Sequence, residues 1–197
     1  MKTDSLKFNL PAFLRHHFGI IVIVGACIGI QLLGLQSELE YQRANLFSQP
    51  ARLLLAHLSH ITWLHLTFNA IALLAINSLF FKDQHSGYTL SALFVLAIAV
   101  SIGLYWFSSD VQWYRGLSGV LHGFFVLGCI QIFKREKISA SLLLSVILVK
   151  LIWEQFSSDN VSNMLGGAVV IVDAHLWGAV TGLLLGGVLA LIKTINK

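Results

Sequence analysis

Four polar residues stand at the start of long apolar runs, and together they have the side chains of an acyl-transfer site. They are Ser118, His175 and the pair His65 and Asn69. Serine is a weak nucleophile until a base takes its proton, and histidine is the side chain most often used as that base. We therefore interpret Ser118 as a candidate nucleophile and His175 as its candidate base.

Attack on an amide carbonyl creates an oxyanion that needs hydrogen-bond donors. His65 and Asn69 are four residues apart, so a helix would place both on one face, from which both could donate. The backbone N–H of Ser118 is a third donor. Gly116 and Gly119, on either side, would let the main chain approach a substrate closely.

The composition indicates a membrane protein that must position these residues on helices. Of the 197 residues, 56% are hydrophobic and only 11% are charged, against about 25% charged in soluble domains. This balance excludes a disordered chain, a coiled coil and a secreted disulfide scaffold. Six apolar runs are visible, at roughly Phe18–Leu35, Ile61–Phe81, Tyr88–Phe107, Leu117–Phe133, Ile138–Trp153 and Ala174–Ile192.

A transmembrane helix needs about 20 mostly apolar residues, so six of them would use most of the chain. We expect an all-α, six-transmembrane-helix bundle that forms one membrane domain over residues 1–197. Its short N-terminal segment would be residues 1–17, and its spans would cover roughly residues 18–192.

Lysine and arginine are distributed unevenly between the two ends of these runs. With six spans, nine of them fall on the side that holds both termini: Lys2, Lys7, Arg15, Lys82, Lys134, Arg135, Lys137, Lys193 and Lys197. Four fall on the other side: Arg43, Arg52, Arg115 and Lys150. Six acidic residues are also assigned to that other side: Glu38, Glu40, Asp110, Glu154, Asp159 and Asp173. Cytoplasmic loops collect Lys and Arg, so both termini are predicted to be cytoplasmic and the polar site to lie near the outer face.

Glycine spacing supports a close approach of the fourth and sixth runs. Gly119 and Gly123 lie on one face of the fourth run, and Gly178, Gly182 and Gly186 lie on one face of the sixth. Small residues four apart let membrane helices come close. Such a contact would bring the serine to the histidine.

Three motifs on these six spans resemble the rhomboid intramembrane serine proteases. They are Gly-Leu-Ser-Gly around Ser118, His-x-x-x-Asn from His65, and Ala-His-x-x-Gly-x-x-x-Gly around His175, and the resemblance extends from roughly Arg52 to Gly186. It implies a Ser118–His175 dyad without an acidic partner, and an oxyanion site made by His65, Asn69 and Ser118. The implied lining of the active site is His60, Gly116, Leu117, Gly119 and His122. Arg52 stands where the family has a Trp-Arg pair, but Ala51 replaces the tryptophan.

The segment Gly-Leu-Ser-Gly-Val-Leu-His-Gly most resembles the rhombosortase subgroup. Many rhomboids have a tyrosine, packed on the base, where this chain has His122. The resemblance implies clients with a C-terminal Gly-Gly, a transmembrane helix and a basic tail. It implies an enzyme that needs no metal, nucleotide or other cofactor and no nucleic acid. The size and the charge bias of the chain favour a bacterial inner membrane. A polar cavity lined by His60, His65, Asn69, Ser118, His122 and His175 would admit water.

Some alternatives stay open at the level of single residues. His122 is four residues after Ser118 and could itself contact the serine as a base. Asp173 is two residues from His175, which on a helix points elsewhere, so we interpret it as an N-cap of the sixth span. His57, His60 and His65 could suggest zinc, but no His-Glu-x-x-His motif is present.

Other function classes also compete with the protease. One alternative is a non-catalytic rhomboid-like binder of membrane clients, although such a protein would be expected to lose Ser118 or His175. A solute transporter would place polar residues near mid-bilayer, whereas here they cluster at the span ends. The residues do not distinguish hydrolysis from transfer of the acyl group to an amine.

Overall fold

The computed structural model describes residues 10–156 and 170–195, and these form helices joined by short connections. Of the charged residues used above, Lys2, Lys7, Asp159 and Lys197 lie outside the described residues. The long helices are α1 (Leu10–Leu33), α4 (Trp63–Ile76), α5 (Ser86–Phe107), α6 (Ser118–Ile132), α7 (Lys137–Phe156) and α8 (Val172–Ile195). A π-helical segment, η2 (Asn77–Phe81), continues α4.

These six helices coincide with the six apolar runs to within a few residues, apart from the start of α1, which begins at Leu10. Four of them are long and apolar enough to cross a membrane: α4 with η2, α5, α7 and α8. The apolar part of α1 (His17–Leu33) and α6 are shorter. The chain is an integral membrane protein, and the prediction of an all-α fold is confirmed.

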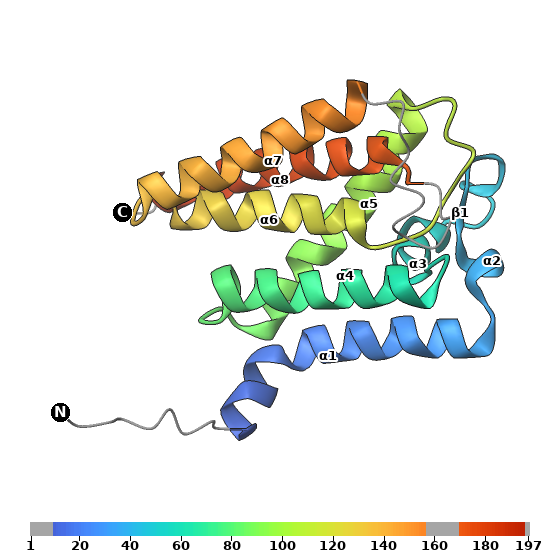
Figure 1. Ribbon diagram of the computed structural model, residues 1–197, viewed down its shortest axis with the longest axis horizontal. Helices are drawn as coiled ribbons and strands as arrows, with labels where there is room; N and C mark the ends of the chain where they lie inside the picture. The colour runs from blue at the N-terminus through green and yellow to red at the C-terminus, as the bar shows by residue number, and fades with distance from the viewer. Residues whose placement is uncertain (1–9, 157–169, 196–197) are drawn as a thin grey trace.

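The small elements gather at one end of the helix bundle (Figure 1). Between α1 and α4 the chain forms α2 (Gln36–Leu39), β1 (Tyr41–Gln42), η1 (Arg43–Asn45) and α3 (Arg52–Leu58). Between α5 and α6 it forms β2 (Trp113–Tyr114), which pairs antiparallel with β1. This short ladder ties the first long loop to the residues that precede Ser118.

Arg43 fixes the first long loop to the end of α5. Its guanidinium donates to the carbonyl oxygens of Leu104, Tyr105 and Ser108 at 3.2, 2.6 and 3.3 Å. The last carbonyls of a helix have no partner within the helix. A cation at this position therefore satisfies them and stabilises the end of α5.

Arg52 and Arg115 converge on Glu40. Arg52 Nη1 donates to the Glu40 carbonyl oxygen at 2.7 Å, and Arg115 Nε donates to the Glu40 carboxylate at 2.6 Å. The loop is therefore anchored by its own polar contacts, although Ala51 offers no tryptophan ring there.

Helix α6 lies at the centre of the bundle, and its apolar side chains make the core. Phe124 is fully buried and stacks on Phe81, with ring centroids 4.0 Å apart. Leu127 is also fully buried and packs in the same cluster as Leu73 and Leu96. By contrast, the buried residues of α7 are Ala140 and Leu151, and most of its apolar side chains are exposed, as befits a lipid-facing surface.

The glycines of α6 and α8 bring the two backbones into direct contact. A Cβ built on Gly178 would lie 1.8 Å from the carbonyl oxygen of Gly119, and one on Gly182 would lie 2.2 Å from that of Gly123. Only hydrogen fits in this space. The close approach predicted from the glycine spacing is confirmed.

Replacing Gly178 by alanine should separate α6 from α8 and lower the thermal unfolding temperature of the protein in detergent. The new methyl group would meet the backbone of Gly119 and Gly123, which cannot rotate away. The free energy of unfolding should therefore fall by at least the ~1–3 kcal/mol typical of overpacked cores. Gly187→Ala is the matched control, because nothing lies within 4 Å of a Cβ there. Equal unfolding temperatures for the two variants would contradict this account.

Candidate functional site

Ser118 and His175 meet at the start of two packed helices. Ser118 is the first residue of α6, and His175 lies in the first turn of α8. The serine Oγ and the histidine Nε2 are 3.0 Å apart, and His175 is 5% exposed. The structure thus brings together the two residues that the sequence nominated from runs 57 positions apart.

Tyr114 organises the turn that presents Ser118. Its hydroxyl donates to the Gly116 carbonyl at 2.5 Å and accepts from the Gly119 N–H at 3.2 Å, so it spans the turn from both sides. Gly116 has φ +127°, a conformation that side chains with a Cβ rarely adopt, and its N–H donates to Ala56. Burial raises the pKa of Tyr114 to about 12, so the hydroxyl keeps the proton that it donates.

His175 has an acidic partner that the family resemblance did not predict. Glu154, on α7, places Oε2 2.9 Å from His175 Nδ1, and both side chains are largely buried. The resemblance implied a histidine without an acidic partner, whereas in this structure a carboxylate contacts His175. The reason is that α7 packs on α8 and carries a carboxylate near its C-terminal end.

Asp173 does not act as the predicted N-cap. Helix α8 begins at Val172, so Asp173 lies inside the first turn instead of before it. A carboxylate there still interacts favourably with the positive end of the helix dipole.

Lys150 and His122 close these contacts into a ring. The Lys150 ammonium donates to the other oxygen of Glu154 and lies 3.0 Å from His122 Nε2. His122 Nδ1 in turn lies 2.7 Å from the carbonyl oxygen of Ser118. The five residues Ser118, His175, Glu154, Lys150 and His122 therefore form a closed chain of hydrogen bonds, which we call the polar ring.

The partners in the polar ring assign the protons of both histidines. A carboxylate and a carbonyl only accept hydrogen bonds, and an ammonium only donates them. His175 must therefore donate from Nδ1 to Glu154, which leaves the Nε2 lone pair facing the Ser118 hydroxyl. His122 must donate from Nδ1 to the Ser118 carbonyl and accept from Lys150 at Nε2.

These proton positions argue against the alternative in which His122 is the base. Both of its ring nitrogens are engaged, and neither contact is with the Ser118 hydroxyl. Its ring instead stacks on that of His175, with centroids 4.1 Å apart and planes 15° from parallel. The geometry favours a packing role for His122 beside the candidate base.

His65 and Asn69 lie beside the turn that precedes Ser118. Thr62 caps α4 by accepting the His65 N–H, which sets the start of this helix. A Cβ on Gly116 would lie 2.7 Å from the His65 ring and 3.8 Å from Asn69 Nδ2. Asn69 Nδ2 is buried without a hydrogen-bond partner among the described residues, so it is free to donate to a substrate oxygen.

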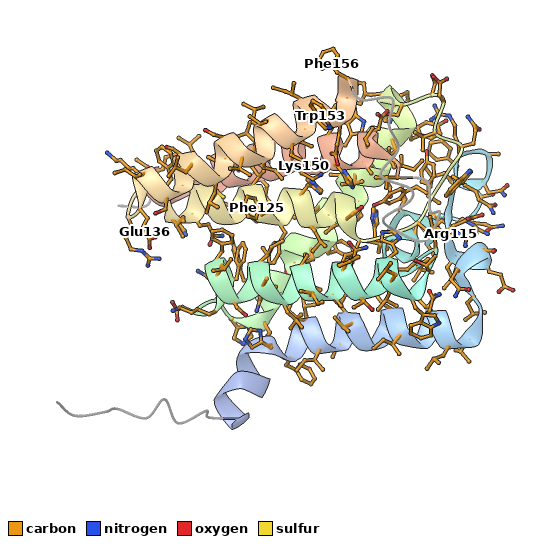
Figure 2. All side chains as sticks on the ribbon, viewed as in Figure 1. Arg115, Phe125, Glu136, Lys150, Trp153 and Phe156 are labelled. Carbon is orange, nitrogen blue, oxygen red and sulfur yellow. The ribbon has the colours of Figure 1, made fainter. Side chains whose placement is uncertain are left out.

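A cavity of about 250 Å³ opens next to Ser118 and His122 between α4 and α7. Asn69 is its other polar residue, and the rest of its lining is apolar: Phe68, Ala72, Ile76, Leu121, Phe125 and Ile147. Phe125 extends from α6 toward η2, where its ring packs on Phe80 (Figure 2). The cavity is therefore less polar than the sequence predicted.

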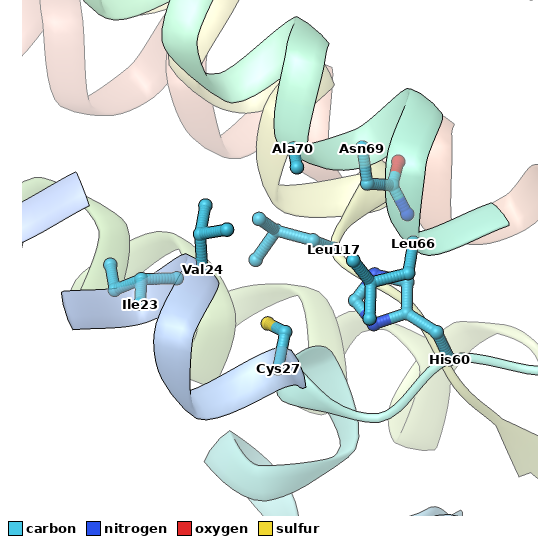
Figure 3. A pocket seen from close by; sticks show the side chains of 8 residues that line it. All are labelled: Ile23, Val24, Cys27, His60, Leu66, Asn69, Ala70 and Leu117. Atoms are coloured by element: carbon cyan, nitrogen blue, oxygen red, sulfur yellow. The ribbon is translucent and has the colours of Figure 1, made fainter. Parts of the chain in front are cut away.

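His60 and Leu117 line a separate and much smaller cavity, of about 10 Å³. Figure 3 shows them with Asn69 and with Cys27 of α1 around this space. Gly119 faces the backbone of Ala174 instead of either cavity. The predicted lining of one shared cavity thus divides into an open site and a buried pocket behind it.

One group of described residues has the spacing of a metal site. His122, Glu154 and His175 each offer one ligand atom, all within 4.8 Å of one another. The Lys150 ammonium already lies against two of these groups, so a metal ion would have to displace a bound cation. The geometry suits the hydrogen-bonded polar ring better than metal coordination.

Residues 47–192, most of the chain, match the Rhomboid domain. The chain belongs to the rhomboid family. A search of curated proteins finds no significant match. Membership implies an intramembrane protease that acts on membrane proteins.

The sequence analysis missed three residues at the site of this rhomboid: Tyr114, Lys150 and Glu154. For Lys150 and Glu154 the sequence does contain a signal. They are four residues apart near the end of an apolar run, a spacing at which opposite charges pair on one helix face. Ionisable residues within a membrane span are functional by default. Nothing in the sequence distinguishes Tyr114 from other loop tyrosines.

Two buried histidines support the site from outside the spanning helices. His57 Nε2 contacts Ser101 Oγ at 3.0 Å, and His60 Nδ1 donates to the Leu58 carbonyl at 3.2 Å. Burial lowers the pKa of His57 from 6.5 to about 4. Burial, with the neighbouring His65, lowers that of His60 to about 3. Both rings are therefore neutral in the folded protein at pH 7.

Tyr114→Phe should reduce the stability and activity of this rhomboid. The variant leaves the Gly119 N–H and the Gly116 carbonyl without their buried partner, a loss of about 1–3 kcal/mol. Thermal unfolding and proteolytic rate would be measured together, with Tyr105→Phe as control, because Tyr105 is only partly buried and its contacts are made through its ring and backbone. Wild-type values for Tyr114→Phe would show that the hydroxyl does not hold the turn.

Acid should destabilise the fold through His57 and His60. Their folded-state pKa values lie below the unfolded value of about 6.5, so the unfolded chain takes up protons first. The stability present above pH 6.5 should therefore fall as the pH drops from about 6.5 toward 4. Unfolding temperature against pH would show this slope. His57→Gln should flatten it, whereas His85→Gln, at an exposed position, should not.

Proposed function

We propose that this protein is an intramembrane serine endopeptidase in which Ser118 is the nucleophile and His175 the general base. The observation that carries the proposal is the 3.0 Å contact between Ser118 Oγ and His175 Nε2 at the wall of an open cavity. This is hydrogen-bond reach for the proton that the base must remove.

The reaction follows from the proton positions. As Ser118 Oγ bonds to the substrate carbonyl carbon, its proton passes to His175 Nε2. The carbonyl oxygen becomes an oxyanion near the Ser118 N–H and Asn69 Nδ2, with His65 alongside. His175 then gives the proton to the leaving amine as the C–N bond breaks, which leaves an acyl-Ser118. Water then attacks this ester as His175 takes one of its protons, and His175 gives that proton to Ser118 Oγ as the C–Oγ bond breaks, which releases the carboxylic acid and restores the serine.

The cavity supports a substrate that arrives from the membrane. Its walls come from α4, α6 and α7, and its apolar side chains surround the few polar groups at Ser118. An unwound segment of a transmembrane helix would find apolar surface for its side chains and donors for its carbonyl. Small residues near the cut would help the segment to unwind.

The client class that we propose is a protein with a C-terminal Gly-Gly, one transmembrane helix and a basic tail. His122 in the segment Gly-Leu-Ser-Gly-Val-Leu-His-Gly supports assignment to the rhombosortase subgroup, and its ring stacks on His175. Lys134, Arg135 and Lys137 lie at the end of α6 opposite Ser118. This charge distribution supports cytoplasmic termini and a site near the outer face of a bacterial inner membrane.

The test is co-expression with a tagged client that carries this C-terminal signal. Ser118→Ala and His175→Ala should each abolish the cleaved product at equal expression. The controls Ser145→Ala and His85→Ala make the same changes at exposed positions and should cleave normally. The mass of the new C-terminus would locate the cut and distinguish hydrolysis from transfer to an amine.

His122→Phe keeps a ring over His175 and should retain cleavage if His175 is the base. Cleavage by Ser118→Ala at the wild-type rate would refute the serine mechanism. Binding of the client without cleavage by wild type would favour the non-catalytic binder.

A further inference from the structure

We infer that Glu154 is a positioning residue that orients His175 and stabilises its protonated form during catalysis. This inference rests on the proposed function and deepens it. Most contacts of the polar ring then act together to present the Nε2 lone pair of His175 to Ser118. The site therefore operates as a serine–histidine–glutamate relay assembled from α6, α8 and α7.

The geometry of Glu154 is that of an orienting carboxylate. Its Oε2 lies 2.9 Å from His175 Nδ1, on the side of the ring opposite Ser118. The two side chains are 9% and 6% exposed, so solvent competes little for the contact. A carboxylate here selects the productive tautomer, and its charge favours the imidazolium that forms when the base takes the serine proton.

Lys150 explains how a carboxylate can stay ionised at this depth. Its ammonium pairs with Glu154 one helical turn away, so the pair is neutral overall. Removing one partner of such a pair leaves an uncompensated charge. Lys150 lies on the face of α7 toward α6 and is 43% exposed, so it reaches both the site and its edge (Figure 2).

Lys150 also links Glu154 to Ser118 by a second series of contacts, which runs through His122. Its contact with His122 Nε2 fixes the ring that stacks on His175 and donates to the Ser118 carbonyl. His175 is therefore held at Nδ1 by a charge and on one face by a ring. Both constraints depend on the same turn of α7.

A purely structural reading competes with this inference. Glu154 could serve only to neutralise Lys150, with no effect on the base. In that case removal of both charges would restore normal turnover, because nothing would be left uncompensated. In the relay, the same double variant stays slow, because His175 still lacks its carboxylate.

The experiment measures the rate at which a fluorophosphonate probe labels Ser118 in the purified full-length protein, together with kcat and KM for a cleaved client. Wild type should be labelled and Ser118→Ala should not. Glu154→Gln, which keeps the shape of the side chain, should reduce labelling and kcat by about 10²–10⁴-fold with little change in KM. Glu154→Asp should recover part of the rate.

Lys150→Gln leaves the Glu154 carboxylate uncompensated and should slow labelling and kcat, but by less than Glu154→Gln, because His175 keeps its carboxylate. The double variant Glu154→Gln/Lys150→Gln should remain slow. Glu136→Gln, the same substitution at the other end of α7, is the matched control and should leave labelling and kcat unchanged (Figure 2). Unfolding temperatures of all variants would identify losses that come from misfolding.

The outcomes separate the two proposals. A wild-type protein that is neither labelled at Ser118 nor active would overturn the serine mechanism, and the relay with it. Labelling of wild type together with undiminished labelling of Glu154→Gln would overturn the relay alone. Wild-type rates in the double variant would assign Glu154 to charge neutralisation. A different outcome would assign His122, Glu154 and His175 to metal binding instead. In that case added Zn²⁺ would lower the labelling rate of wild type, a chelator would restore it, and Zn²⁺ would not affect the labelling rate of Glu154→Gln.

Discussion

The backbone contact between α6 and α8 is the constraint on which the site depends. Gly178 touches the carbonyl of Gly119, and Gly182 touches that of Gly123, at distances that admit no Cβ. In a membrane, apolar side chains gain little by leaving lipid, so close packing of small residues must hold the helices together. Because Ser118 and His175 lie in the first turns of these two helices, the same contact sets the distance between the proposed nucleophile and its proposed base.

The second constraint is electrostatic. Charged side chains are expensive in a bilayer unless they find partners. Glu154 and Lys150 meet this requirement by pairing with each other, and the two histidines then occupy their remaining hydrogen-bonding sites. The polar ring is closed and neutral, so most of its groups satisfy one another. In such a setting the tautomer of His175, the proposed base, is defined before any substrate arrives.

Parts of the chain outside the long helices hold the turn that positions Ser118, the proposed nucleophile. The β1–β2 ladder, the Tyr114 hydroxyl and the Gly116 N–H bond to Ala56 hold the turn before Ser118 from three directions. Arg43 fixes the same loop region to the end of α5. On the other side of the site, the cavity opens between α4 and α7, and α7 buries few residues. The site thus joins a hydrogen-bonded turn at Ser118 to an open cavity.

The sequence by itself determined the class of protein, the six helices, the glycine contact and the pair Ser118 and His175. Each of these is encoded locally, by apolar length, by small residues four apart, or by a polar residue at the start of a run. Only the tertiary structure decided the partner of His175, the stacking of His122 and the division between the open cavity and the pocket behind Asn69. Glu154 could not be assigned from spacing, because its role depends on which face of α7 packs on α8. That choice is made by side-chain packing between elements, which no local pattern records.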